Sequence, residues 1–301
     1  MITEINFTKK LNDNFRKNVK LSNYSWFNLG GNAEYFYKAE DKNQLIKLLA
    51  EAKKKNLKTT ILGAGSNILF RDSGVKGIVI KLGSEFSYTK LIEKNIILTG
   101  AATLDRKVAN FAKENSLENL EFLSCIPGSI GGAVIMNSGC YGNDISKVLL
   151  SVNVIDKKKL KEIEIKKDDI KFLYRGTGLP DDLIIISAKL QGTIGQKKEI
   201  EKKQLDFIER KKLSQPSQIK TCGSTFKNIS NNKKAWMLIK QSGCENYRVG
   251  GAIISPKHCN FFINNGNAKS SDIENLIKKV RRKVFEKTGV NLELEIKIIG
   301  E

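Results

Sequence analysis

The feature that most constrains this chain is a glycine-rich run of nine residues, 125–133, with the sequence Cys-Ile-Pro-Gly-Ser-Ile-Gly-Gly-Ala. Glycine adopts backbone dihedrals that other residues avoid, and it lets other groups approach the main chain closely. Three glycines beside Pro127 and Ser129 exceed what an ordinary turn requires. The run therefore indicates a loop whose backbone meets several other groups.

A second glycine turn, Gly-Ala-Gly-Ser-Asn at residues 63–67, lies between segments 58–62 and 77–82, which both read as strands. It is not the Rossmann fingerprint, because it lacks the third glycine and no clear helix follows it. Taken alone, the turn fits a tight turn without a ligand equally well. Two such loops close together present backbone N–H groups that can hold the pyrophosphate of a dinucleotide.

The remaining pattern mixes helices and strands and predicts an α+β protein. Helices are expected at 42–55, 105–115, 197–212, 234–242 and 272–287. Strands are expected at 95–98, 149–155, 160–165, 183–190, 224–227, 252–255 and 292–298. Ser271 and Glu274 form a capping box for the last helix. The final strand alternates strictly, so Leu292, Leu294, Ile296 and Ile298 are expected to face the core and Glu293, Glu295 and Lys297 the other side.

The composition limits the chemistry. Five cysteines without a CxxC pair indicate reduced thiols, so neither a disulfide nor zinc is expected. The single histidine, His258, excludes multi-histidine metal sites, and a structural role is expected for it. No apolar stretch reaches the ~20 residues that span a membrane, and the start lacks a signal peptide. These features predict a cytoplasmic protein without a metal or a membrane partner.

A net charge of +20 over 301 residues leaves nucleic-acid binding as an alternative, since basic surfaces attract phosphate. The lysines are however spread along amphipathic segments with acidic residues between them, and only eight of the 52 basic residues are arginine. This pattern favours a compositional bias, and we expect no nucleic-acid partner.

Nine motifs together resemble the UDP-N-acetylenolpyruvoylglucosamine reductase family, in that family's order and over nearly the whole chain. They are Asn28 to Ala33, Leu62 to Asn67, Ile126 to Ala133, Met136-Asn137, Tyr141-Gly142, Tyr174-Arg175, Gly223 to Asn228, Lys257 to Phe261 and Leu292 to Gly300. The short span between Tyr174 and Gly223 is similar to the compact branch, which lacks an added substrate-capping loop.

The resemblance implies an α+β fold in which two FAD-binding subdomains of the vanillyl-alcohol oxidase and p-cresol methylhydroxylase type, 1–86 and 87–205, precede a C-terminal substrate domain, 206–301. It implies non-covalent FAD and NADPH as cosubstrate, with UDP-N-acetylglucosamine enolpyruvyl ether reduced to UDP-N-acetylmuramate for peptidoglycan synthesis. We expect a monomer. The residues expected to bind FAD are Gly63, Ala64, Gly65, Ser66, Asn67, Pro127, Gly128, Ser129, Gly131 and Gly132.

The implied mechanism adds hydride to the terminal carbon of the enolpyruvyl ether, which places negative charge on the substrate carboxylate as an enolate. Arg175 is the candidate for holding that carboxylate, because guanidinium binds it in a bidentate manner. Ser224 matches the family's proton donor. Glu295 matches a glutamate at the same site, where we expect its acid form, since an anion would repel the enolate. Tyr174, Lys227 and Asn228 match substrate-binding positions.

Some residues depart from the family pattern. Cys125 stands where glycine is usual, Leu294 where proline is usual, and residues 176–178 lack the usual polar residue and serine, which leaves the local support of Arg175 open. An FAD-linked oxidase or dehydrogenase of the same fold, acting on another alcohol or acid, is an alternative. Covalent flavin attachment is common in such enzymes, but neither glycine loop contains a histidine.

Overall fold

The computed structural model describes residues 14–230 and 232–301 and divides the chain into two compact units. Unit 1 comprises Met1–Val19, Glu34–Ala64 and Gly77–Ile208. Unit 2 comprises Lys20–Ala33, Gly65–Lys76 and Glu209–Glu301. Neither unit is a continuous stretch of sequence. The predicted division into three domains at residues 86 and 205 stays a prediction.

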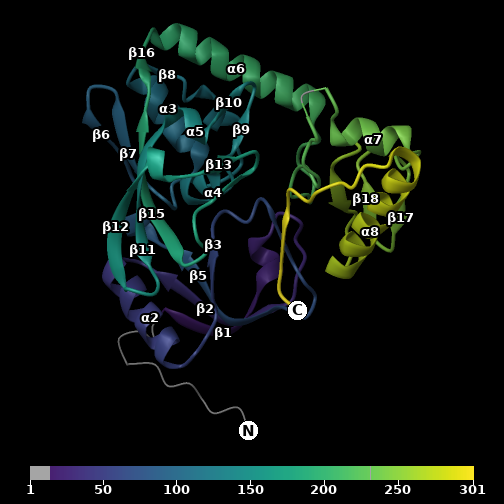
Figure 1. The fold of residues 1–301 in the computed structure, drawn as a ribbon, viewed down its shortest axis with the longest axis horizontal. Coiled ribbons are helices and arrows are strands. Elements are labelled where there is room, and N and C mark those ends of the chain that lie inside the picture. Colours follow the sequence, from purple (N-terminus) through teal and green to yellow (C-terminus); the bar gives the residue numbers. More distant parts are fainter. Residues whose placement is uncertain (1–13, 231) are drawn as a thin grey trace. The chain divides into compact units, whose positions relative to one another are not determined.

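Unit 1 is built around a five-stranded antiparallel sheet with the order β12-β11-β15-β7-β6 (Figure 1). Its strands are β6 (Thr89–Glu93), β7 (Ile96–Gly100), β11 (Leu149–Asp156), β12 (Lys161–Lys166) and β15 (Leu183–Gln191). β11 and β15 are rich in Val, Ile and Leu and are buried along most of their length, as expected of central strands covered on both faces. β12 is an edge strand rich in Lys and Glu, and charged side chains on an edge strand disfavour pairing with a further strand.

A second sheet has the order β1-β2-β5-β3, with β3 and β5 parallel. Its strands are β1 (Phe15–Lys20), β2 (Asn32–Ala39), β3 (Thr59–Leu62) and β5 (Val75–Leu82). α2 (Lys42–Lys54) joins β2 to β3 and begins where the Asp41 side chain accepts a hydrogen bond of 2.8 Å from the Gln44 amide. The predicted strands on both sides of the first glycine turn are thus present.

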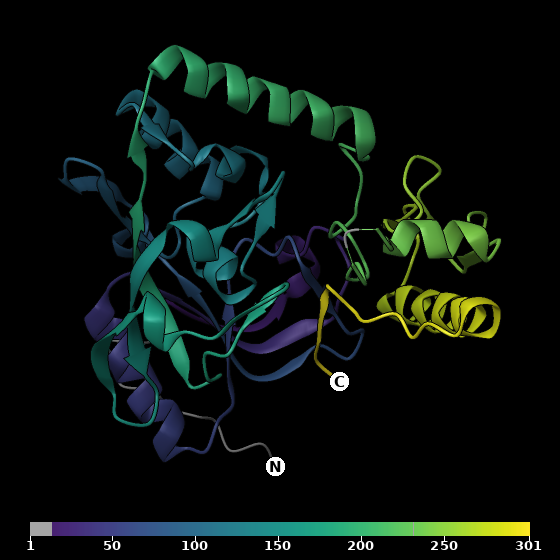
Figure 2. The same ribbon diagram turned by 45° about the horizontal axis from the view of Figure 1, so that its top comes forward.

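The other helices of unit 1 are α3 (Asp105–Glu114), α4 (Ile130–Ile135), α5 (Ile145–Val148) and the first part of α6 (Lys197–Ser214). α6 lies beside α3 in Figures 1 and 2, where Lys113 pairs with Glu201 at 3.2 Å and the Gln204 side chain donates to the Ala109 carbonyl at 2.9 Å. α4, which directly follows the second glycine loop, was not expected from the sequence.

Unit 2 has its own apolar core, formed by α7 (Ala235–Gln241), α8 (Ser270–Thr288) and a sheet of β17 (Arg248–Val249), β18 (Ala252–Ile254) and β19 (Phe262–Asn264). The two helices lie beside each other in Figure 2. β4 (Ile68–Phe70) pairs in parallel with β20 (Lys297–Ile299), so the end of the chain returns to the residues that follow the first glycine turn.

The predicted capping box of α8 is wrong. The amides of Ser270 and Ser271 donate to the two carboxylate oxygens of Asp72, at 2.8 and 2.9 Å, and Asp272 accepts from the Lys269 amide. Gly289, with φ of 68°, ends the helix as predicted.

The predicted C-terminal strand is also shorter than expected. Only β20 is a regular strand, and Leu294 adds an isolated bridge to Phe226. The segment has two different partners, Phe226 and β4, so its ladder is interrupted. Leu292 and Ile296 are nevertheless buried, as the alternation predicts.

The remaining elements are short. They are the 3-10 helices η1 (Leu21–Tyr24), η2 (Ser84–Phe86), η3 (Glu121–Cys125) and η4 (Lys167–Asp169), and the strands β8 (Leu117–Glu118), β9 (Gly139–Cys140), β10 (Asn143–Asp144), β13 (Phe172–Leu173), β14 (Gly176–Thr177) and β16 (Thr193–Ile194). In the part of the chain that the structure describes, no helix combines the length and the apolarity needed to cross a membrane.

Candidate active site

The start of the first predicted glycine loop, Gly63, meets the second loop within unit 1. A Cβ built on Gly63 would lie 2.9 Å from the Ser129 hydroxyl oxygen, so the loops are in contact. The second loop is anchored from behind, because the amides of Ile130 and Gly131 donate to the carbonyls of Thr103 and Ala101 at 3.0 and 2.9 Å. The amide of Ser129 donates no hydrogen bond to any residue that the structure describes. It remains available to an anion.

The first loop requires glycine at its centre. Gly65 has a φ of 73°, and a Cβ there would lie only 1.8 Å from the Tyr24 carbonyl oxygen. The Gly65 carbonyl accepts from the Trp26 amide at 3.1 Å. The amides of Ala64 and Ser66, in contrast, have no acceptor among residues 14–230 and 232–301. Like the second loop, the first loop is held by backbone hydrogen bonds while some of its backbone N–H groups have no acceptor among the described residues.

Lys81 is a residue near the loops that sequence reasoning missed. Its Nζ donates to the Gly63 carbonyl at 2.9 Å. Burial lowers the pKa of Lys81, and the nearby charge of Lys38 lowers it further. The available signal was a lysine between Ile80 and Leu82 in the otherwise buried end of β5.

Within unit 1, the free amides of Ala64 and Ser129 together with Lys81 fit the diphosphate of a dinucleotide, which needs N–H donors and positive charge. The glycines also leave the loop backbone open to close approach. The residues present in the two loops therefore fit FAD, the cofactor that the motifs imply.

Ser224 and Glu295 are brought together in unit 2. The Glu295 amide donates to the carbonyl of Thr225, the next residue after Ser224, at 2.9 Å. Ser224 itself forms an isolated bridge to Phe261, and both Ser224 and Glu295 are partly buried. Two of the three predicted catalytic residues thus lie on neighbouring backbone segments.

Asn260 fixes the segment that carries Ser224. Its side chain accepts from the Phe226 amide at 3.0 Å and donates to the Phe226 carbonyl at 2.8 Å, and its own carbonyl accepts from the Thr225 amide at 2.8 Å. Asn260 is buried, so these bonds are shielded from water. The Ser224 backbone is therefore held rigidly.

Asn67 joins the first glycine loop to Glu295. Its Nδ2 donates to the Glu295 carbonyl at 3.0 Å, and its own carbonyl accepts from the Lys297 amide at 2.9 Å. Asn67, a predicted FAD-binding residue, is thus hydrogen-bonded directly to the backbone of Glu295, a predicted catalytic residue.

Lys227 and Asn228 extend the Ser224 segment. Lys227 Nζ lies 3.6 Å from a carboxylate oxygen of the exposed Glu293, which is a loose surface ion pair. Asn228 Oδ1 accepts from the Ala235 amide at 3.0 Å, at the first residue of α7. The Asn228 side chain thus has a structural role, with its Nδ2 facing no acceptor among the described residues.

Arg175 belongs to unit 1, at the turn between β13 and β14. It has a φ of 58°, its Nη2 donates to the Gly139 carbonyl at 3.0 Å, and its guanidinium carbon lies 4.9 Å from the centre of the Tyr174 ring. The hairpin is tied to α4, since the Thr177 hydroxyl donates to the Ile135 carbonyl at 3.4 Å. The support of Arg175, which the sequence left open, includes Gly139 and Tyr174.

His258 packs against aromatic rings instead of lining a charged site. Its Nδ1 accepts from the Asn260 amide at 3.2 Å, its ring meets Phe261 edge-on at 4.8 Å, and burial lowers its pKa. The five cysteines are free thiols, and within the described residues no group of three His, Cys, Asp or Glu side chains is placed to hold a metal ion.

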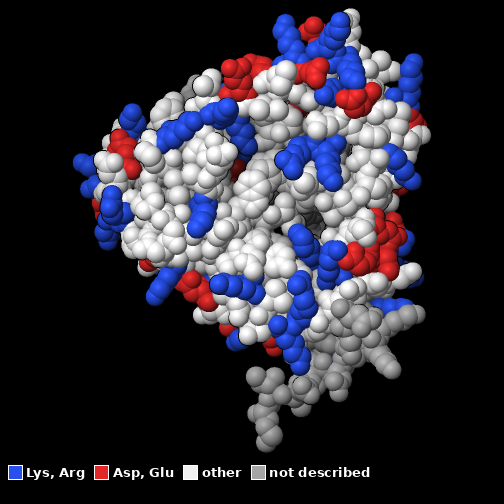
Figure 3. Space-filling model, turned by 180° about the vertical axis from the view of Figure 1, so that it is seen from behind, with Lys and Arg blue, Asp and Glu red and all other residues white. Residues whose placement is uncertain are grey.

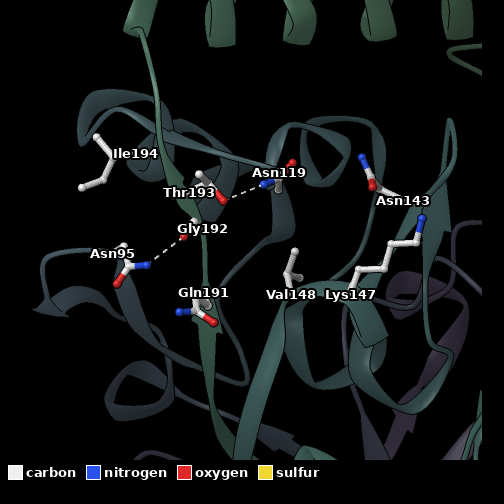
Figure 4. A pocket seen from close by; sticks show the side chains of 9 residues that line it. All are labelled: Asn95, Asn119, Asn143, Lys147, Val148, Gln191, Gly192, Thr193 and Ile194. Atoms are coloured by element: carbon white, nitrogen blue, oxygen red, sulfur yellow. Dashed lines mark hydrogen bonds between the residues drawn. The ribbon is translucent and has the colours of Figure 1, made fainter.

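A surface pocket of about 600 Å³ lies elsewhere in unit 1 (Figure 4). It is lined by Asn95, Asn119, Asn143, Lys147, Val148, Gln191, Gly192, Thr193 and Ile194. Asn95 and Asn119 use their amide groups on Gly192 and Thr193. None of the predicted site residues lines it, so this pocket is not the predicted site.

Comparison with known proteins decides the family. Residues 33–159 match the FAD binding domain family, and residues 215–299 match the family described as UDP-N-acetylenolpyruvoylglucosamine reductase, C-terminal domain. The chain is 45% identical to the UDP-N-acetylenolpyruvoylglucosamine reductase of Orientia tsutsugamushi (strain Ikeda), over 97% of this chain and 96% of that protein. The chain belongs to the UDP-N-acetylenolpyruvoylglucosamine reductase family.

Other members of this reductase family agree. The enzyme of the same name from Pelagibacter ubique (strain HTCC1062) is 43% identical over 95% of this chain and 94% of its own. The crystal structure of UDP-N-acetylenolpyruvylglucosamine reductase from Thermus caldophilus matches with a TM-score of 0.83 at 30% identity, covering 95% of this chain and 100% of that one.

Membership in the reductase family confirms several expectations from the motifs. The resemblance itself is confirmed, as is the α+β fold with an FAD-binding part and a C-terminal domain of this family. The chain is an oxidoreductase of the FAD-binding kind.

Proposed function

We propose that this protein reduces UDP-N-acetylglucosamine enolpyruvyl ether to UDP-N-acetylmuramate, a step in peptidoglycan precursor synthesis, with FAD as cofactor and NADPH as hydride source. One observation carries the proposal. Ser224 and Glu295, a proton donor and a carboxyl suited to enolate chemistry, lie on adjacent backbone joined by the Glu295 to Thr225 hydrogen bond of 2.9 Å. Asn67 ties the FAD-loop end to the same segment at 3.0 Å.

Ser224 donates the proton that completes the reduction. A serine hydroxyl is a weak acid in water, so its activity must come from placement toward one carbon. The bonds from Asn260 to Thr225 and Phe226 supply that rigidity. Glu295 acts from its acid form, which stabilises the enolate by donating a hydrogen bond where a carboxylate would repel it.

Arg175 holds and polarises the carboxylate of the enolpyruvyl group. The hydrogen bond from Nη2 to the Gly139 carbonyl orients the guanidinium, and a planar guanidinium suits bidentate binding of a carboxylate. Tyr174, which is half exposed, contributes a substrate contact next to it. Lys227 and Asn228 Nδ2 provide positive charge and a donor for the diphosphate and uridine side of the substrate.

Two loops hold FAD without a covalent bond. Their predicted contact residues are Gly63, Ala64, Gly65, Ser66, Asn67, Pro127, Gly128, Ser129, Gly131 and Gly132. When bound, FAD accepts hydride from NADPH and supplies it to the substrate. Lys81 Nζ binds the Gly63 carbonyl, and the loop amides without an acceptor would hold the diphosphate.

We further propose that the protein works as a cytoplasmic monomer, without a nucleic-acid or membrane partner. Basic and acidic side chains are mixed over the face seen in Figure 3. The division into subdomains 1–86 and 87–205 and a substrate domain 206–301 belongs to the same proposal.

A titration of the two half-reactions tests the function. Purified protein with FAD is mixed anaerobically with NADPH, and UDP-N-acetylglucosamine enolpyruvyl ether is then added. The yellow colour should bleach with NADPH and return in proportion to the enolpyruvyl compound. An oxidase of the same fold would regain its colour with oxygen but not with the enolpyruvyl ether, and that result would contradict the proposal.

A further inference from the structure

Asp105, the first residue of α3, is a fully buried carboxyl with 0% exposure. Neither of its side-chain oxygens has a hydrogen-bond partner in the part of the chain that the structure describes. Buried carboxyls normally pair with a cation or accept several hydrogen bonds, because an unpartnered one is costly. The arrangement therefore calls for an explanation.

The Asp105 carboxyl lies directly behind the second glycine loop. The backbone amide of Asp105 donates to the Gly128 carbonyl at 3.2 Å, and a Cβ built on Gly128 would lie 2.6 Å from Oδ2 of Asp105. The carboxyl thus lies against the Cα of Gly128, and a Cβ at this position would require it to move. The amides of Gly128 and Ser129 make no hydrogen bond to any described residue.

No charged neighbour accounts for the carboxyl. Its own helix, α3, carries Arg106 and Lys107, and the elements packed against α3 are η3, which carries Glu121 and Cys125, and β8, which carries Glu118. Glu121 is already paired with Lys203 of α6, at 3.1 Å. Burial alone raises the pKa of Asp105 well above its usual range. Burial therefore favours the protonated, uncharged form of this side chain.

We propose that Asp105 is a positioning residue for FAD, a neutral acid behind the Gly128 loop whose ionisation weakens cofactor binding. The proposal rests on the proposed function, since it takes this loop as a diphosphate site. An ionised carboxylate would place a negative charge beside the amides that receive a diphosphate dianion, in a place that water does not screen. FAD binding and a proton on Asp105 therefore favour each other.

The pH dependence of FAD affinity tests this coupling. FAD is titrated into apoprotein from about pH 6 to about pH 9, and binding is followed by flavin fluorescence. The Kd of the wild type should be constant at low pH and rise up to about tenfold per pH unit once the free Asp105 ionises. Asp105→Asn keeps the shape without the charge, so its Kd should stay flat at the low-pH value.

Asp182→Asn is the matched control, since Asp182 is a partly exposed aspartate of unit 1 paired with Lys158 at 2.6 Å. It should keep the wild-type pH profile. A flat wild-type profile, or an Asp105→Asn profile that rises like the wild type, overturns the Asp105 proposal alone. Failure of every variant to bind FAD at any pH would instead overturn the assignment of the loops.

Calorimetry on the wild type covers the case in which Asp105→Asn does not fold. FAD binding is measured in two buffers of different ionisation enthalpy, above the pH at which affinity begins to fall. Uptake approaching one proton per FAD supports the coupling. Binding without proton uptake contradicts it.

Discussion

Glu293 and Glu295 are two residues apart on one extended segment, yet their surroundings differ. The Glu293 side chain is 78% exposed and pairs loosely with Lys227. Glu295 is partly buried, and its main chain is bonded on one side to Thr225 and on the other to Asn67. The alternating sequence pattern places both glutamates on the same face of the strand, so the pattern alone cannot tell which of them has a function. The difference supports a functional role for Glu295.

Ser224→Ala should separate the two half-reactions. Reduction of FAD by NADPH should stay within about twofold of the wild type, whereas reoxidation by the enolpyruvyl ether should slow by about 10²- to 10⁴-fold, because only that step needs the proton. Stopped-flow absorbance measures both. Ser217→Ala, an exposed serine in the same unit, should change neither. An equal loss in both half-reactions for Ser224→Ala would argue for a structural defect.

Arg175→Lys should keep the positive charge but lose the hydrogen-bonding geometry of the guanidinium. Lysine lacks the planar pair of N–H donors, so the bidentate contact with the carboxylate is lost. We therefore expect kcat/KM for the enolpyruvyl substrate to fall by about 10- to 100-fold. Steady-state kinetics measure it, with Lys171→Gln on the exposed part of the same hairpin as the control. Unchanged kcat/KM in Arg175→Lys would remove the assigned role.

At the scale of elements, the start of α8 depends on Asp72. Burial raises the pKa of Asp72, but hydrogen bonds from Ser271 and Ser270 outweigh it and hold the pKa below its ordinary value. A lowered pKa means that this stabilisation is present above the unfolded value of 3.8 and is lost as the pH falls through the folded pKa.

Asp72→Ala should therefore lower the free energy of unfolding by about 1–2 kcal/mol near neutral pH, as expected for a lost cap. The difference from the wild type should shrink below the usual aspartate pKa of about 4. Urea unfolding at several pH values measures it. Asp168→Ala, in the exposed turn η4, is the control, and a pH-independent difference for Asp72→Ala would contradict the capping role.

Sequence periodicity predicted longer helices such as α2 and α8, because each has a self-contained apolar stripe, for example Leu45, Leu48 and Leu49 in α2, but it did not predict the short helices α4 and α5. It failed where a partner lies far away in the chain. Asp72 caps a helix 198 residues later, so the local Ser271 and Glu274 pattern gave the wrong cap.

The same limit applied to the site. The motifs predicted both glycine loops, Ser224 and Glu295. Lys81 and Asp105 contact the loops through tertiary interactions, which no local sequence pattern predicts. An aspartate at the start of a helix is ordinary, so nothing in the sequence distinguished Asp105.

At the scale of the whole molecule, the charge of +20 predicts weak attachment to any polyanion. Binding to a DNA duplex, measured by fluorescence anisotropy, should be detectable at about 50 mM salt and vanish by about 200 mM, because it rests on counterion release. FAD should stay bound over the same range, as shown by retention of yellow colour after desalting. DNA binding that survives the higher salt would favour the nucleic-acid alternative.

The hydrogen bond between Asn67 and the Glu295 carbonyl joins residues 228 positions apart, and β20 closes on β4 over a similar distance. During synthesis the first glycine loop leaves the ribosome well before Glu295 and β20, which fix its far end and follow Asn67 by 228 positions or more. Closing so long a loop is entropically unfavourable and slow, so this pairing belongs to the late stages of folding. A nascent chain therefore carries a cofactor loop that is not yet fixed at one end until β20 has been synthesised.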